Sequence, residues 1–339
     1  MREYTNKHGL PGAIVEAVKN DDYDPGESDI TATSMIKPPQ LRQLEKRYEN
    51  EIVEDVSDRL WMLMGKAVHK LLETTEPSSI VETRLYATVD PDTGRIEPGP
   101  HAFAGGVTVG GQFDRMTLRR ATLQDYKFTS VWEVIMGLKP EREQQLNILA
   151  ELAHQNGYTG IRRLEIVHLG RDWQRSKSLQ GGDYPAVPMN RMSVPLRTPE
   201  ERQAFILERV RVHAHAEALA DSELPECTDE ERWKNPAKYA IRKKGRKSAI
   251  SGGVCDTRGE AEAKLSELDS QHWIEERASE PKRCSQGYCP VRDFCWQWQT
   301  ESTGEPPRAQ NAADEILHLE MQALRRETLA GALGDGGRG

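Results

Sequence analysis

The order of helical and β-rich segments between residues 57 and 170 constrains the fold of this chain more than any other feature. Residues 57–74 place leucine, methionine and valine at helical spacing, with Ser57 or Asp58 available as the N-cap. A helix begun by Pro140 and ended by Gly157 comes later, and RRLEIVHLG supplies a strand after it. Between the two helices lie four β-rich runs, over 80–89, 101–109, 112–118 and 122–128. This order predicts an α/β protein with a central mixed sheet flanked by helices.

Length and composition predict one large core with smaller additions. A chain of 339 residues can bury a full α/β core, and 37% apolar, 29% charged and 6% aromatic residues are typical of a helix-rich globular protein. No apolar run approaches the roughly 18 residues of a membrane helix, so we expect a cytoplasmic protein with no membrane partner. We expect four segments: a lead-in over 1–33, the core over 34–198, a helical and basic region with a cysteine cluster over 199–310, and a helix with a disordered tail over 311–339.

Basic residues gather in one stretch of a chain whose net charge is -8. The segment KNPAKYAIRKKGRK, residues 234–247, holds seven basic residues and no acid. Lysine and arginine neutralise backbone phosphates without reading sequence, and an aromatic ring can stack on an unpaired base. The segment is either a DNA-guiding element or a solvated basic turn. Under the first interpretation the DNA-contacting residues are Lys238, Tyr239, Arg242, Lys243, Lys244, Arg246 and Lys247.

Two neighbouring β-rich runs carry acidic residues that can share one cation. Alternate residues of a strand share a face, so in LQDYKF the side chains of Asp125 and Lys127 point one way and Tyr126 the other. The short turn before this run can place Asp114, in GGQFDRM, beside Asp125. Two close carboxylates repel unless a cation lies between them. The pattern predicts a Mg²⁺ or Mn²⁺ site, with ordinary surface ion pairs on a sheet as the alternative.

Such a site suits phosphodiester hydrolysis. Bound metal ions generate hydroxide near neutral pH and stabilise the attacking and leaving oxygens, while a nearby lysine positions water or neutralises developing charge. Lys127 is the candidate for that lysine.

Four motifs in order resemble the RecB-like branch of the PD-(D/E)XK nuclease superfamily. They are GKAVH with Gly65 and His69, GGQFD with Asp114, DYK with Asp125 and Lys127, and QLNIL with Gln145. The resemblance covers roughly residues 34–170 and is close to nuclease-like proteins of phages and prophages, to which the C-terminal third is also similar. It implies a restriction-endonuclease-like core.

The resemblance also implies roles for individual residues. His69, Asp114 and Asp125 would bind the metal together with the backbone carbonyl of Tyr126, and Lys127 would be the catalytic lysine. On one face of the helix, the glycine four residues before His69 would allow close approach to the sheet.

By the same resemblance, Gln145 would assist catalysis. The motif's tyrosine is replaced by Leu149, so the hydroxyl usual at that position is missing. Gln144 can take the role of Gln145 if the helix is rotated slightly, and a solvated glutamine on an amphipathic helix is the alternative to both.

Three cysteines lie close together in RCSQGYCPVRDFCW, as C-x4-C-x5-C, and such grouping in a cysteine-poor chain indicates metal ligation. We expect Cys227 as the fourth ligand of Cys284, Cys289 and Cys295, with Cys255 as the rival. Four thiolates suit a [4Fe-4S] cluster or Zn²⁺. Some RecB-like nucleases carry such a cluster, but their first cysteine precedes the nuclease motifs and their last three are spaced C-x2-C-x5-C. Reduced, partly buried thiols are the alternative.

We therefore expect a Mg²⁺- or Mn²⁺-dependent DNA nuclease, an exonuclease of phage or bacterial DNA recombination acting in the cytoplasm of a bacterial host. The alternatives are a structure-specific endonuclease and a catalytically silent DNA-binding module. A third possibility is a helicase-associated subunit, which would need a helicase partner because the chain lacks the G-x-x-x-x-G-K-[ST] motif for binding ATP. A single-strand annealing protein is the other candidate partner. Some relatives of this fold form rings, so the oligomeric state is left open.

Overall fold

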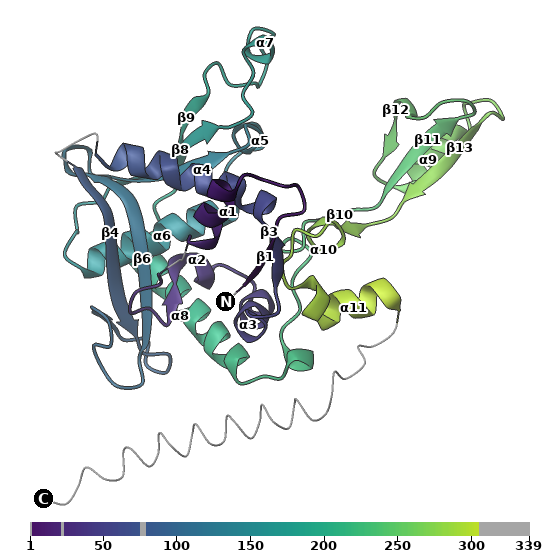
Figure 1. The fold of residues 1–339 in the computed structure, drawn as a ribbon. Helices are drawn as coiled ribbons and strands as arrows, with labels where there is room; N and C mark the ends of the chain where they lie inside the picture. The colour runs from purple at the N-terminus through teal and green to yellow at the C-terminus, as the bar shows by residue number, and fades with distance from the viewer. Residues whose placement is uncertain (1, 22–23, 75–78, 305–339) are drawn as a thin grey trace, which may run out of the picture. The chain divides into compact units, whose positions relative to one another are not determined.

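The computed structural model describes residues 2–21, 24–74 and 79–304, in two compact units (Figure 1). Of the described residues, those up to Arg42 and those from Glu49 to Glu217 form unit 1, and Gln43–Tyr48 together with those from Ala218 onward form unit 2. The helix α8 (Pro199–Glu217), which follows the expected end of the core at residue 198, belongs to unit 1. The helix and tail expected over 311–339 lie outside the described residues.

Unit 1 is built on a mixed sheet, which confirms the predicted α/β class. Its strand order is β5-β4-β6-β7-β8-β9, with β2 pairing parallel to β6. The pair β7–β8 is parallel and the other neighbouring pairs on the path are antiparallel. The strands are β2 (Ile30–Thr31), β4 (Ser79–Val89), β5 (Ile96–Pro98), β6 (Val107–Thr117), β7 (Thr122–Thr129), β8 (Arg163–Gly170) and β9 (Met189–Val194).

One strand replaces two of the predicted runs. The expected strands over 101–109 and 112–118 are wrong as separate elements, because β6 runs without a break from Val107 and the residues before it form turns. Gly110 and Gly111 lie inside the strand and do not end it. A Cβ at Gly111 would lie 2.6 Å from Cδ2 of Leu149, so glycine there allows the following helix to pack closely on the sheet.

Helices cover both faces of this sheet. The helix α6 (Pro140–Gln155) connects the parallel strands β7 and β8 and buries Leu146, Leu149 and Leu152 in the core, with α8 packed beside it. In Figure 1 the strands β4 and β6 run side by side, and α6 packs against both. The helix α4 (Val56–Glu73) contacts β7 and confirms the helix predicted over 57–74. Its cap is Asp55, which accepts a hydrogen bond from Ser57 N at 3.0 Å, rather than Ser57 or Asp58.

Shorter elements complete the region before α4 and the loops of the sheet. The strand β1 pairs parallel to β3. These elements are β1 (Glu3–Thr5), α1 (Gly12–Lys19), α2 (Ala32–Met35), α3 (Pro39–Arg47), β3 (Val53–Asp55), η1 (Leu118–Arg120), α5 (Trp132–Ile135) and α7 (Arg175–Ser178). In the described ranges, no helix has both the length and the apolar character needed to cross a membrane.

Unit 2 contains a small sheet where a mainly helical region was expected. Its order is β12-β11-β13, all antiparallel, and α9 packs against it. Two adjacent apolar residues in the middle of the basic segment, Ala240 and Ile241, are fully buried and give this strand its place in a sheet. The elements are η2 (Asp221–Glu223), β10 (Lys234–Asn235), β11 (Lys238–Lys243), β12 (Ala249–Cys255), α9 (Arg258–Leu265), β13 (His272–Arg277), β14 (Glu280–Pro281), α10 (Lys282–Ser285), η3 (Arg292–Phe294) and α11 (Trp296–Thr303).

Candidate functional site

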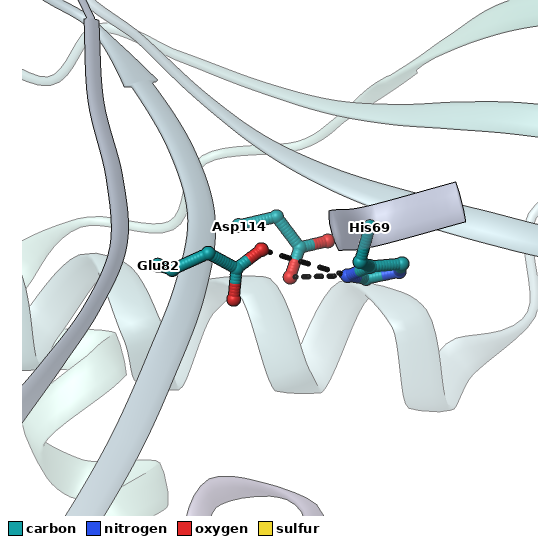
Figure 2. A group of neighbouring side chains, drawn as sticks. All are labelled: His69, Glu82 and Asp114. Atoms are coloured by element: carbon teal, nitrogen blue, oxygen red, sulfur yellow. Dashed lines mark ion pairs between the residues drawn. The ribbon is translucent and has the colours of Figure 1, made fainter. Parts of the chain in front are cut away.

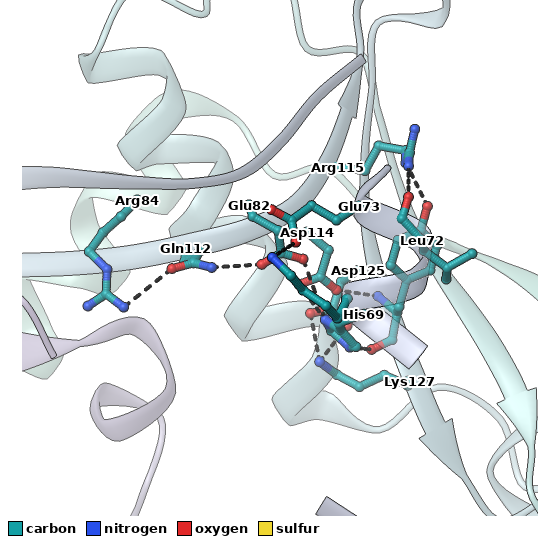
Figure 3. Close-up of polar contacts among 12 residues, drawn as sticks. His69, Leu72, Glu73, Glu82, Arg84, Gln112, Asp114, Arg115, Asp125 and Lys127 are labelled. Atoms are coloured by element: carbon teal, nitrogen blue, oxygen red, sulfur yellow. Dashed lines mark hydrogen bonds and ion pairs between the residues drawn. The ribbon is translucent and has the colours of Figure 1, made fainter. Parts of the chain in front are cut away.

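The site lies where β6 and β7 part. The two strands pair only as far as Arg115 with Gln124, and the next residues along each strand are Asp114 and Asp125. Beyond that point a side chain takes the place of the backbone hydrogen bonds between the strands. Oδ2 of Asp114 accepts a hydrogen bond from Tyr126 N at 2.5 Å. The divergence leaves room for two acidic side chains between strands that would otherwise be bonded to each other (Figure 3).

His69 reaches this fork from α4. Its Nε2 lies 3.1 Å from the carbonyl oxygen of Tyr126, and its Nδ1 lies 3.4 Å from Oδ1 of Asp114 and 3.7 Å from Oε1 of Glu82 (Figure 2). Among the described residues, His69, Glu82 and Asp114 form the only group of three or more whose potential ligand atoms all lie within 4.8 Å of one another. The structure therefore brings His69 close to both Asp114 and the carbonyl group of Tyr126, but these lie at different ring nitrogens, Nδ1 and Nε2, so the carbonyl as a metal ligand stays a prediction.

Glu82 is the residue of this group that sequence reasoning missed. Its neighbours in β4 pair with the neighbours of Asp114 in β6, so the two acids lie opposite each other. Its backbone has a φ of 44°, in the left-handed region, and such strain costs on the order of 1–3 kcal/mol for a non-glycine residue. Gln112 donates to Oε2 of Glu82 at 2.7 Å and accepts from Arg84 at 3.3 Å, which holds the glutamate in place.

Asp125 and Lys127 form a buried ion pair on the other side of the fork. Lys127 Nζ lies 2.6 Å from the Asp125 carboxylate, whose residue is only 3% exposed. Burial and the nearby charge of Asp114 raise the pKa of Asp125 against the opposing effect of Lys127. Arg142 of α6, also missed in the sequence, adds positive charge near Asp125 and is held by Glu133 at 2.8 Å. Burial alone would raise the pKa of Glu133, but Arg142 outweighs it and lowers that pKa to about 2.

The charge balance of the fork suits a divalent cation. Burial alone would lower the pKa of His69, but its hydrogen bonds to Asp114 and Glu82 outweigh burial and raise that pKa to about 10. A proton on the ring thus compensates two adjacent carboxylates. A metal ion bound by the same three side chains would supply this positive charge and displace the proton. Carboxylate oxygens with water suit Mg²⁺, and a mixture of carboxylate and imidazole also suits Mn²⁺, so the donor set fits either ion.

Arg115 ties the helix that carries His69 to the strand behind it. Its Nη2 donates to the carbonyl oxygen of Leu72, near the end of α4, at 2.5 Å, and its Nε donates to the hydroxyl of Tyr126 at 2.8 Å. The residue is 3% exposed, so these hydrogen bonds are made in a poorly solvated place where they are strong. Arg115 is therefore a positioning residue for His69.

Gln145 is not part of this group of ligands. Its side-chain amide donates to the hydroxyl of Thr33 at 3.3 Å, which connects α6 to α2. Leu149, in place of the motif's tyrosine, is buried in the core close to Gly111, where a tyrosine ring would not fit without displacing the sheet. Any role of Gln145 in catalysis stays a prediction.

Three cysteines of the predicted cluster affect one another's pKa within unit 2, but among the described residues no three cysteine sulfur atoms all lie within 4.8 Å of one another. Burial and the charges of nearby groups raise the pKa of Cys227, and Cys289 and Cys295 are among those groups. Burial likewise raises the pKa of Cys289 to about 11, with Cys284 and Cys295 contributing. Cys255 instead lies in β12, where it pairs with Tyr239.

Gln297 fixes the backbone of Cys227 near Cys295. It accepts from Cys227 N at 3.0 Å and donates to Cys227 O at 3.0 Å, and it lies two residues after Cys295 on α11. The arrangement favours Cys227 over Cys255 as the fourth thiol, whereas ligation itself stays a prediction.

The basic segment forms β10, β11 and the turn that leads into β12, and part of its charge is compensated there. Lys238 pairs with Asp256, and Arg242 Nε lies 3.0 Å from Glu275. The turn from Lys244 to Lys247 lies beyond these ion pairs and is exposed, and Gly245 within it has a φ of 83°. The positive charge open to a ligand is thus at this turn.

Comparison with protein-family models gives no match, and comparison with curated proteins gives none either. Among solved structures, the crystal structure of SSO0001 is similar, with a TM-score of 0.43 and 12% identity over 65% of this chain and 89% of that chain. The residues of the site therefore carry the functional argument by themselves.

Proposed function

We propose that this chain is a metal-dependent deoxyribonuclease with a restriction-endonuclease-like core of the RecB-like PD-(D/E)XK type. The observation that carries the proposal is the strand fork, because it places His69, Asp114, Asp125 and Lys127 together from three separate elements. Carboxylates around a histidine, with a lysine at their edge, are the groups that bind a divalent cation and a phosphodiester at the same place.

Each residue then has a defined task. His69, Glu82 and Asp114 hold the cation, and Asp125 lies across the fork as a further ligand. The bound cation supplies Lewis acidity that lowers the pKa of water and stabilises charge on the phosphate. The amine of Lys127, 2.6 Å from Asp125, orients the attacking water or compensates the negative charge that develops on the phosphate.

The biological part of the proposal is an exonuclease of phage or bacterial recombination that acts on DNA in the cytoplasm beside an annealing or helicase partner. It includes a [4Fe-4S] cluster or Zn²⁺ on Cys227, Cys284, Cys289 and Cys295. What supports the cluster is that burial and neighbouring thiols raise the pKa of Cys227, Cys289 and Cys295.

The test is degradation of end-labelled linear and closed circular DNA, single- and double-stranded, with Mg²⁺, Mn²⁺ or EDTA. The parent is compared with Lys127→Ala and Asp125→Ala, and Lys19→Ala on the exposed side of α1 is the matched control. We expect metal-dependent loss of label with the parent and the control, and a loss of activity of about 100-fold or more in both site variants. Release from free ends establishes an exonuclease, whereas cutting of circles establishes an endonuclease. A parent that binds DNA but is inert with every metal would leave a DNA-binding module in place of an enzyme.

A further inference from the structure

Four arginines of unit 1 line a hollow that no part of the proposed catalytic site uses. It has a volume of about 550 Å³, and its lining residues are Arg119, Arg120, Ala121, Gly160, Arg162 and Arg163. The first pair lies in the turn between β6 and β7, and the second lies at the start of β8. The charges therefore come from segments about 40 residues apart in the sequence that the sheet brings together.

Backbone hydrogen bonds fix the two pairs side by side. The carbonyl oxygen of Ala121 accepts from Arg162 N at 2.8 Å and from Arg163 N at 3.1 Å, and Thr122 pairs with Arg163 in the parallel ladder β7–β8. Ala121 has a φ of 51° and a ψ of 41°, so an alanine adopts the left-handed conformation at the centre of the hollow. Backbone strain of this kind persists where the surroundings hold it and gathers at ligand-binding sites.

The charge of the hollow is not compensated within the described part of the chain. All four arginines are exposed, and none of them has a carboxylate partner among residues 2–21, 24–74 and 79–304. Four exposed guanidinium groups around one hollow create a local positive potential that attracts an anion. The guanidinium fork matches the oxygens of a phosphate, to which it donates two parallel hydrogen bonds.

The hollow lies at the start of β7, the strand that carries Asp125 of the catalytic fork. From Ala121 to Asp125 are four residues, or about 13 Å at 3.3 Å per residue. DNA rises 3.4 Å per nucleotide along its axis, so that separation is about four nucleotides. We infer that the arginine hollow binds backbone phosphates of the same DNA molecule, about four nucleotides from the bond held at the fork. This inference rests on the proposed function for its choice of DNA over other polyanions.

The experiment measures binding without cleavage, as fluorescence anisotropy of a labelled DNA duplex in EDTA at several salt concentrations. The variants are Arg119→Gln/Arg120→Gln and Arg162→Gln/Arg163→Gln. The matched control is Arg175→Gln/Arg191→Gln, which removes the same charge from exposed positions of unit 1 outside the hollow. We expect each hollow variant to bind about tenfold more weakly and to lose up to about 2 from the slope of log K against log salt, since each phosphate contact contributes about 0.9. The control keeps the parent's slope to within about half a contact.

A second set of duplexes, each with one neutral methylphosphonate, locates the phosphate. Neutralising the phosphate held by the hollow weakens binding of the parent and has a smaller effect on binding of each arginine variant. Arg119→Lys/Arg120→Lys retains the charge and is expected to keep most of the salt slope, which separates lost charge from a disturbed turn.

The outcomes separate this inference from the proposed function. Hollow variants that bind DNA as tightly and with the same salt slope as the parent and the control would overturn the inference, even if the parent is an active nuclease. A parent whose binding depends on the four arginines but which cleaves nothing would overturn the catalytic proposal and support the hollow as a phosphate site.

Discussion

Asp114 uses its two carboxylate oxygens for different purposes. Its Oδ2 accepts a hydrogen bond from Tyr126 N at 2.5 Å and so holds the strands together where their ladder ends, while its Oδ1 lies 3.4 Å from His69 Nδ1. Replacing this residue therefore disturbs the sheet and the ligand group at once. Variants of Glu82 and Lys127 test the chemistry more cleanly.

Glu82→Gln is expected to weaken Mn²⁺ binding and DNA hydrolysis by about tenfold to 100-fold, because the amide keeps the shape but removes a charged ligand. Isothermal titration calorimetry with Mn²⁺ measures the first effect independently of activity. Glu97→Gln, in the short strand β5, is the control and is expected to bind Mn²⁺ like the parent. Equal metal affinity in Glu82→Gln and the parent would remove Glu82 from the site.

The buried pair between Glu151 and Arg202 is expected to be costly to break from one side. Arg202 Nε lies 2.9 Å from Glu151 Oε2, and the two residues are 6% and 0% exposed. Arg202→Met leaves the carboxylate buried without its cation and should lower the free energy of unfolding by about 3–5 kcal/mol. The double variant Arg202→Met/Glu151→Leu should recover part of that loss in urea denaturation. A double variant less stable than the single one would contradict this account.

His213 should make the protein sensitive to mild acid. Burial lowers its pKa from 6.5 to about 4, although the carbonyl of Met35, 2.8 Å from Nε2, opposes the shift. As the pH falls, the unfolded chain takes up a proton on His213 before the folded protein does. The stability that depends on neutral His213 is therefore fully present above pH 6.5, declines as the pH falls and is lost by about pH 4. The expected loss is about 2 kcal/mol at pH 5 relative to pH 7.

His213→Gln is expected to remove that part of the pH dependence, measured as the urea midpoint between pH 7 and pH 5. His215→Gln, on the exposed side of the same helix, should keep the parent's pH dependence. If both variants follow the parent curve, His213 is not the titrating group.

If the cysteines bind a metal, Cys227→Ser and Cys255→Ser are expected to differ in metal content. Anaerobically purified protein is expected to contain iron, with brown colour and visible absorption, or zinc, by metal analysis. Cys227→Ser should lose most of the metal, whereas Cys255→Ser, in β12, should retain it. Loss in Cys255→Ser but not in Cys227→Ser would reverse the choice of fourth ligand, and metal-free parent protein would leave four reduced thiols.

Period and local preference explain what was predictable. The side-chain period of two in a strand places Asp125 and Lys127 on one face wherever that strand lies, and the ion pair at 2.6 Å follows from it. The apolar spacing of α4 likewise predicted a helix over 57–74, although the cap at Asp55 was missed. These features depend only on residues that are close together in the sequence.

Register and strand pairing were not predictable from the chain. Glu82 lies opposite Asp114 only because β4 and β6 adopt one register among several that their apolar patterns allow. The four arginines of the hollow meet because β7 and β8 pair in parallel across the helix α6. The sequence by itself determined which residues could take part in metal and phosphate chemistry and which of them share a strand face. Only the tertiary structure decided which segments became neighbours, because pairing between distant strands depends on the core that all of them bury together.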